Sequence, residues 1–259
     1  MKLTTKMTTS AIILGALALN GSSVLAAEKA SYESNGIVEF TESNDITKPI
    51  DPTDPGEEVD PIDPTDPEGP NPGTPGPLSI DYASSLTFGK NKISNKNETC
   101  FANAQKIKDG SHRPNYVQVT DTRTGNLGWN LSVKQEGQFS NATATNKTLT
   151  GTTLQLASGT ANSASTSPAA IAESVVTLDP AGATSVVMSA EKGSGWGTWA
   201  SYYGTVENME IAGETPEENE TVAVNKAVTL SVPGATPKDA VKYSTKLTWI
   251  LSDIPTEEE

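Results

Sequence analysis

The sequence is poor in the residues on which many catalytic and metal sites depend. Among its 259 residues there is one cysteine, Cys100, and one histidine, His112. A single cysteine excludes a disulfide within one chain, and this pair cannot supply the ligands of a Cys/His zinc site. His112 lies in a loop-like Asp-Gly-Ser-His-Arg-Pro context without a nucleophile elbow, which argues against a serine–histidine mechanism. We therefore expect no metal, no cofactor and no histidine-based catalysis.

Large apolar side chains are also scarce, with aromatic residues at 5% and all hydrophobic residues at 35%. A thin core with many Thr and Ser residues suits β-sheets better than helix bundles. Apolar and polar residues alternate, as expected for half-buried strands, while residues 171–178 fit a short helix or a strand equally well. The pattern predicts an all-β, sandwich-like multi-strand domain over residues 78–259, with strands near 78–82, 86–88, 116–119, 127–133, 149–156 and 227–232.

The first 26 residues have the order of a secretory signal peptide. Lys2 and Lys6 precede an uncharged apolar run at 11–19, and small residues lead to Ala26. The run is about half the ~20 residues that span a bilayer, so a retained anchor is the weaker interpretation. We expect cleavage after Ala26, with Ala27 as the alternative, and a secreted protein. No second apolar span and no C-terminal sorting motif follow, so the folded part must hold the protein at the surface.

Residues 27–77 differ sharply from the rest in charge and in proline content. The whole chain has a formal net charge of −14, which argues against a nucleic-acid partner. Most of this charge lies in residues 27–77, which carry 13 acidic and 2 basic side chains. Ten of the 17 prolines lie in residues 48–77, where Ile-Asp-Pro-Thr-Asp-Pro occurs at 50–55 and again at 62–67. Proline opposes helix and central strand, and like charges repel. This composition predicts a disordered, extended acidic stalk that acts as a spacer rather than a calcium site.

Two tryptophans stand in similar alternating segments far apart in the chain. One segment places Trp129, Leu131 and Val133 on one face of a strand. The second, near the C-terminus, places four apolar side chains on one face: Tyr243, Leu247, Trp249 and Leu251. Such tryptophans are either core residues, each burying on the order of 200 Å², or part of a surface on which sugar rings stack.

With these segments, residues 78–259 resemble the WxL domain of Gram-positive surface proteins. Trp129-Asn130-Leu131 matches the first Trp-x-Leu motif, and Trp249-Ile250-Leu251 matches the second within a Tyr-x-x-x-Leu-Thr-Trp-x-Leu-x-x-x-Pro pattern ending at Pro255. The resemblance implies non-covalent attachment to the cell wall through peptidoglycan, complexes with companion wall proteins, and no catalytic activity. It makes these two motifs the peptidoglycan-binding or supporting residues.

Two further groups are candidates for supporting that site. Asp121 and Arg123, two positions apart on a predicted strand, form either a structural ion pair or a ligand contact. Trp196 and Trp199 belong to an aromatic cluster beside a glycine-rich stretch. That cluster is either a glycan platform or a loop that Trp199 pins to the core.

Three hypotheses about function follow from these observations. The first is a wall-binding surface protein that holds peptidoglycan. The second is an interaction module that docks on a companion surface protein or on host matrix proteins, so that wall retention is indirect. The third is a wall hydrolase that uses two of the 19 acidic residues of the domain. We favour the first, with the second as the alternative, and expect a cell-wall location with no transmembrane span after signal removal.

Overall fold

The computed structural model describes residues 30–211 and 219–253, in two units that divide after Phe40. The first unit, Met1–Phe40, is described only from residue 30, and those residues form no helix or strand. The second unit, Thr41–Glu259, contains all described strands. The predicted signal peptide (1–26) and Pro255 lie outside the described residues.

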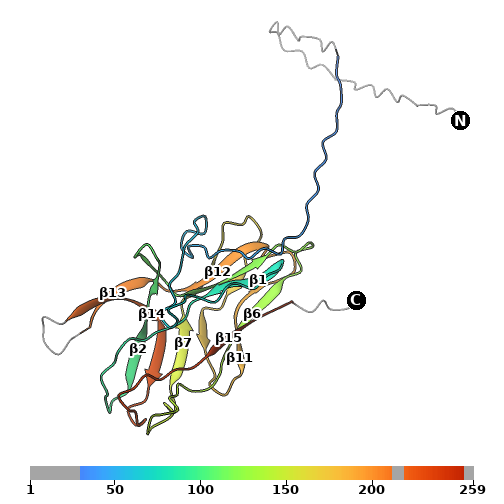
Figure 1. The fold of residues 1–259 in the computed structure, drawn as a ribbon. Coiled ribbons are helices and arrows are strands. Elements are labelled where there is room, and N and C mark those ends of the chain that lie inside the picture. The colour runs from blue at the N-terminus through green and yellow to red at the C-terminus, as the bar shows by residue number, and fades with distance from the viewer. Residues whose placement is uncertain (1–29, 212–218, 254–259) are drawn as a thin grey trace, which may run out of the picture. The chain divides into compact units, whose positions relative to one another are not determined.

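The second unit is built from three antiparallel sheets and a short ribbon (Figure 1). The first sheet has the order β1 (Leu78–Ala83), β5 (Tyr116–Asp121), β12 (Gly197–Tyr203), β8 (Gly159–Asn162). The second has β10 (Val175–Thr177), β7 (Thr153–Ala157), β14 (Glu220–Val232) and β13 (Val206–Ile211), and β2 (Glu98–Asn103) also pairs with β14. The third has β15 (Leu247–Asp253), β6 (Trp129–Gln135), β11 (Thr184–Ala190) and β9 (Ile171–Ala172). The ribbon joins β3 (Gln105–Lys106) and β4 (His112–Arg113).

All three sheets contribute to one hydrophobic core. Strand β6 shows how the sequence builds it, because buried and half-buried residues alternate along its whole length. Val119 enters the same core from β5, Leu154 from β7 and Met188 from β11. The prediction of an all-β, sandwich-like fold is therefore confirmed.

Most of the predicted strands are present, and the differences have simple causes. Residues 86–88 form no strand. Leu86 and Phe88 are half buried against the core from a loop, so their alternation reflects packing alone. Residues 171–178, which the sequence left open, contain the short strands β9 and β10.

Strand β5 is buried on both faces, and this determines how the chain before β1 lies. Val117 and Val119 point into the core, whereas Tyr116, Gln118 and Thr120 point the other way and are still buried. This outer face is polar, so its groups need hydrogen-bond partners.

Asp81 on the neighbouring strand β1 lies at the centre of that polar face. Its carboxylate accepts hydrogen bonds from Gln118 Nε2 at 2.9 Å, Thr120 Oγ1 at 2.6 Å and Ser79 Oγ at 2.6 Å. Burial raises the pKa of Asp81 even though these three donors act to lower it.

The segment that covers this face, residues 48–77, is here called the strap. The Gln118 side chain accepts a hydrogen bond from Ile50 N at 2.8 Å and donates one to Lys48 O at 2.9 Å. Further along, Ile62 N donates to Lys106 O at 2.9 Å and Thr74 N to Ile80 O at 2.9 Å. The prediction of an extended stalk is therefore wrong for residues 48–77, because Gln118 of β5, Lys106 of β3 and Ile80 of β1 bind this segment.

The two hexapeptide repeats adopt the same turn and dock in the same way. In each, one oxygen of the first aspartate caps the turn: Asp51 Oδ1 accepts from Thr53 N at 2.9 Å, and Asp63 Oδ1 from Thr65 N at 2.7 Å. The other oxygen reaches the domain, from Asp51 to the Arg113 guanidinium and from Asp63 to Ser85 Oγ at 2.6 Å. The repeat is thus a docking unit used twice, once on a cation and once on a hydroxyl.

We predict that Asp51→Asn destabilises the folded domain by about 1–3 kcal/mol at pH 7, because it leaves the half-buried Arg113 without its carboxylate. Burial alone would raise the pKa of Asp51, but the Thr53 hydroxyl and amide and the Arg113 guanidinium outweigh burial and lower it. A lowered pKa stabilises the fold above the unfolded-state value of about 4, and this is lost as the pH falls through the folded-state value. Urea unfolding should therefore show the difference from wild type shrinking towards pH 3.

The matched control is Asp54→Asn in the same repeat, since Asp54 is exposed. Equal stability of the two variants at pH 7 would show that the Arg113 contact does not hold the strap.

Candidate functional site

The two Trp-x-Leu motifs lie side by side on adjacent antiparallel strands, β6 and β15. Leu251 is the cross-strand partner of Leu131, and Trp249 is the partner of Val133. The register continues to Asp253, which lies opposite Trp129. Segments that are far apart in the sequence thus form one structural unit in the third sheet.

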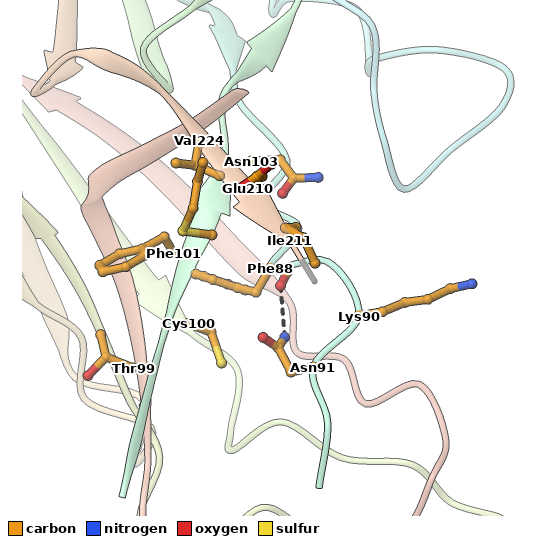
Figure 2. A pocket seen from close by; sticks show the side chains of 11 residues that line it. Phe88, Lys90, Asn91, Thr99, Cys100, Phe101, Asn103, Glu210, Ile211 and Val224 are labelled. Carbon is orange, nitrogen blue, oxygen red and sulfur yellow. Dashed lines mark hydrogen bonds between the residues drawn. The ribbon is translucent and has the colours of Figure 1, made fainter. Parts of the chain in front are cut away.

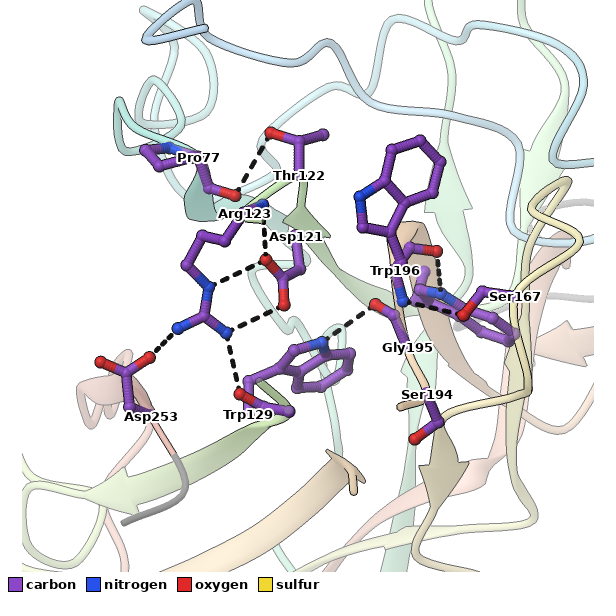
Figure 3. A network of polar contacts seen from close by, with 12 residues as sticks. Pro77, Asp121, Thr122, Arg123, Trp129, Ser167, Ser194, Gly195, Trp196 and Asp253 are labelled. Atoms are coloured by element: carbon purple, nitrogen blue, oxygen red, sulfur yellow. Dashed lines mark hydrogen bonds and ion pairs between the residues drawn. The ribbon is translucent and has the colours of Figure 1, made fainter. Parts of the chain in front are cut away.

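The first motif is part of the core. Trp129 and Leu131 are both 0% exposed, and the Trp129 indole N–H donates to the Gly195 carbonyl at 3.1 Å (Figure 3). Gly195 has φ +71°, and a Cβ there would lie 2.2 Å from Ala190 Cβ and 2.9 Å from Trp129 Nε1. The loop that carries Gly195 therefore closes directly over the indole, and Trp129 cannot touch a ligand in this conformation.

The second motif lies on the edge strand of the same sheet and is half buried. Leu247, Trp249 and Leu251 pack against the core from one face of β15, while Ile250 on the other face is 40% exposed. Trp249 therefore covers the core rather than standing free in solvent.

Arg123 connects both motifs to the end of β5. Its guanidinium binds both oxygens of the buried Asp121, with Nε and Nη2 each at 2.9 Å, and Nη2 also donates to Gly128 O at 2.8 Å. Nη1 contacts Asp253 at the end of β15 (Figure 3). Asp121 and Arg123 thus form a structural clamp. Gly128 directly precedes the first motif, and Asp253 lies two residues after the second.

Tyr243 lies before the strand on which the sequence placed it, since β15 begins at Leu247. Its hydroxyl donates to Asn146 O at 2.7 Å and accepts from Asp239 N at 3.0 Å. Asp239 in turn accepts from Thr145 N and Asn146 N. Tyr243 therefore ties the loop at 141–148 to the segment before β15.

The structure separates the two tryptophans of the glycine-rich region. Trp199 on β12 is 5% exposed, and its indole N–H donates to Trp196 O at 3.1 Å, which pins the loop to the core. Trp196 itself is 44% exposed, and its backbone N–H donates to Ser167 Oγ at 3.2 Å (Figure 3). The indole of Trp196 is thus an open aromatic surface on a loop that two hydrogen bonds hold in place.

Three loops meet around this tryptophan. Gly193 N donates to Asn126 O at 2.8 Å, and Gly195 N to Pro168 O at 2.9 Å, so the segments at 122–128, 163–170 and 191–196 are joined. Leu127, 38% exposed, lies on the first of them. The sequence analysis missed Ser167 and Asp253. Neither residue belongs to a recognisable motif, and only the folded structure shows which residues they contact.

The described residues carry little that suggests chemistry. In 30–211 and 219–253, no three His, Cys, Asp or Glu side chains gather in a way that could hold a metal ion. Burial and the neighbouring Glu98 raise the pKa of Cys100, which keeps its thiol protonated and poorly nucleophilic at neutral pH. The same two ranges contain no helix long and apolar enough to cross a membrane.

The described residues thus form an all-β domain with an exposed indole on a loop held by hydrogen bonds. Comparison with known families assigns it: the family model described as "WxL domain surface cell wall-binding" matches residues 27–255, and the chain belongs to this family. No curated protein and no solved structure matches the chain. The match spans the strap as well as the strands, in agreement with the docking seen here.

We predict that Arg123→Lys destabilises the domain by about 1–3 kcal/mol, because a lysine keeps the charge but loses the two-point contact to Asp121. Urea unfolding measures the effect. Asp253→Asn should cost well under about 1 kcal/mol because the Asp253 side chain is 69% exposed. A lysine variant as stable as wild type would contradict the clamp.

We also predict that substituting Trp129 and Trp196 has different effects on stability, although Trp129 contacts the loop that carries Trp196. Trp129→Ala should cost about 3–5 kcal/mol, because it empties a fully buried site. Trp196→Ala should change stability by about 0.5 kcal/mol or less, because its indole is exposed. Thermal unfolding of the two variants measures these changes. A large loss of stability in Trp196→Ala would mean that its side chain belongs to the core.

Proposed function

We propose that this chain is a non-catalytic surface protein that attaches non-covalently to the cell wall by binding peptidoglycan through its WxL domain. The family assignment supports wall binding in general. The predicted signal peptide supports secretion, and the family match begins at residue 27, directly after the expected cleavage site.

The observation that carries the proposal is the exposed indole of Trp196 on a fixed loop. The C–H faces of a hexosamine ring pack well on an aromatic ring, and a loop ordered in advance loses little entropy when it binds. The hydroxyls of Ser167 and Ser194 lie on the same group of loops (Figure 3) and donate within the protein, to Pro168 O and Glu191 O, so their oxygen atoms can accept hydrogen bonds from glycan hydroxyl or amide groups. Peptidoglycan therefore fits this end of the domain.

In this proposal the two Trp-x-Leu motifs support the site without touching the glycan. Trp129 holds Gly195, the residue before Trp196, through its indole N–H. Trp249 and Leu251 complete the sheet that carries Trp129. Asp121 and Arg123 fix the loop at 122–128 on the opposite side.

The alternative is docking on a companion surface protein or host matrix protein, with indirect wall retention. One observation favours it: β15 is the edge strand of its sheet and exposes Ile250. An edge strand with an apolar side chain on its outer face suits another polypeptide better than a glycan.

The test is co-sedimentation of residues 27–259 with protein-free sacculi. We expect the wild type to pellet and Trp196→Ala to lose about tenfold in affinity, which equals about 1.4 kcal/mol. Trp196→Phe should keep most of the binding because it keeps an aromatic face. Val241→Ala, which trims another exposed apolar side chain, is the control and should bind as wild type.

A folded wild type that stays in the supernatant would show that direct peptidoglycan binding is wrong and would favour the protein partner. Equal binding by wild type and Trp196→Ala would place the glycan elsewhere on the domain. Release of soluble muropeptides would identify a hydrolase instead.

A further inference from the structure

The first unit contains some of the most exposed large apolar side chains among the described residues. Tyr32 is 95% exposed, Ile37 96%, Val38 75% and Phe40 88%. Three of them lie in residues 36–41, Gly-Ile-Val-Glu-Phe-Thr, which we call the apolar segment. β-branched and aromatic residues favour a strand, and clustered exposed apolar side chains indicate an interaction site.

The apolar segment also lies within the part of the chain that the family model matches, residues 27–255. It is thus part of the region that matches the family model. The physical question is which surface takes up these side chains.

The second unit has a hollow of about 220 Å³ that suits an apolar strand. It lies between β2, the β13–β14 hairpin and the loop at 88–91 (Figure 2). Much of its lining is apolar: Phe88, Phe101, Met209, Ile211 and Val224. Figure 1 shows that the hairpin extends away from the body of the second unit, which leaves the hollow accessible from the side.

Strand β2 offers backbone groups at the border of this hollow. Among the described strands, β2 pairs with β14 alone, but Asn103 N at its end donates to Thr87 O at 2.8 Å, which leaves residues 98–101 as the open part of the other edge. A strand at the edge of a sheet presents N–H and C=O groups that can bind an added strand. An apolar segment placed there gains main-chain hydrogen bonds and buries every second side chain in the hollow.

The charges of the two surfaces are complementary. Residues 30–46, which contain the apolar segment, include four acidic residues and no lysine or arginine. The loop at 89–97 contains three lysines and no acidic residue. Lys90 and Glu210 both line the hollow, but the loop as a whole carries three positive charges, so an acidic strand is attracted to the loop side of this border.

We propose that the apolar segment of one copy adds as a strand to the open part of the β2 edge, residues 98–101, in a second copy of this chain. Val38 and Phe40, which share a face of an extended strand, fill the hollow, and Glu39 and Glu42 lie near the lysines of the loop at 89–97. Each copy carries one donor segment and one acceptor hollow. The contact is heterologous, so it links copies head to tail instead of closing a symmetric pair.

The expected affinity is modest. A six-residue strand buries less surface than a standard interface of about 1,600 Å², so association in the micromolar range is expected. Copies held close together on one surface would meet at a much higher effective concentration.

Sedimentation velocity of residues 27–259 at about 5 to 200 µM tests the proposal at the concentrations that this affinity requires. We expect the weight-average mass to rise above that of one chain as the concentration increases. The donor variant Val38→Asp/Phe40→Asp and the acceptor variant Met209→Glu should each remain single chains over this range. The control Val175→Glu, a charge placed at another exposed apolar side chain on β10, should associate as the wild type does.

A mixture of the donor and acceptor variants provides the decisive measurement. The acceptor variant keeps an intact segment and the donor variant keeps an intact hollow, so the mixture should form a one-to-one dimer and nothing larger. This result also shows that the donor variant is folded, because its hollow binds the segment. A thermal unfolding midpoint close to that of wild type shows the same for the acceptor variant.

A wild type that remains a single chain at the highest concentration would overturn the proposal, including the case in which the segment fills the hollow of its own chain. Association that survives either variant, or a mixture that stays as single chains, would overturn it as well. No sacculi are present, so the outcome is independent of the peptidoglycan experiment.

Discussion

The structure depends on one constraint, the burial of β5 on both faces. Its inner side chains reach the common core. Its outer side chains are mostly polar, and burying them without hydrogen-bond partners would cost free energy. Asp81 on the neighbouring strand accepts hydrogen bonds from this face, and the strap, which precedes β1, supplies further hydrogen-bond partners. The acidic, proline-rich segment therefore belongs to the folded domain, and its two repeats mark two contact points on one surface.

The end of β5 also organises the candidate site. Asp121 holds Arg123, which reaches Gly128 before the first motif and Asp253 after the second. Trp129 then positions the loop that presents Trp196. Trp129 thus acts on the residue it holds, and in the proposed function the exposed indole of Trp196 is the group that meets the ligand.

Periodicity in the sequence was enough to predict the strand class, the main strands and the shared face of Trp129, Leu131 and Val133. It could not show that residues 48–77 dock, because their partners Gln118 and Arg113 lie more than 50 residues away and have no local signature. It also could not rank Trp196 above Trp199, since exposure depends on which loop closes over which ring. The strand position assumed for Tyr243 was wrong, because a hydroxyl bonded to Asn146 holds that residue in a loop.

The pairing of Leu131 with Leu251 has a consequence for how the chain reaches this state. The two strands are about 120 residues apart in the sequence, so β6 keeps one open, apolar-faced edge until the last strand arrives. Closing so long a loop is slow compared with forming a hairpin. The third sheet therefore stays open along one side of β6 until residues 247–253 are available to close it.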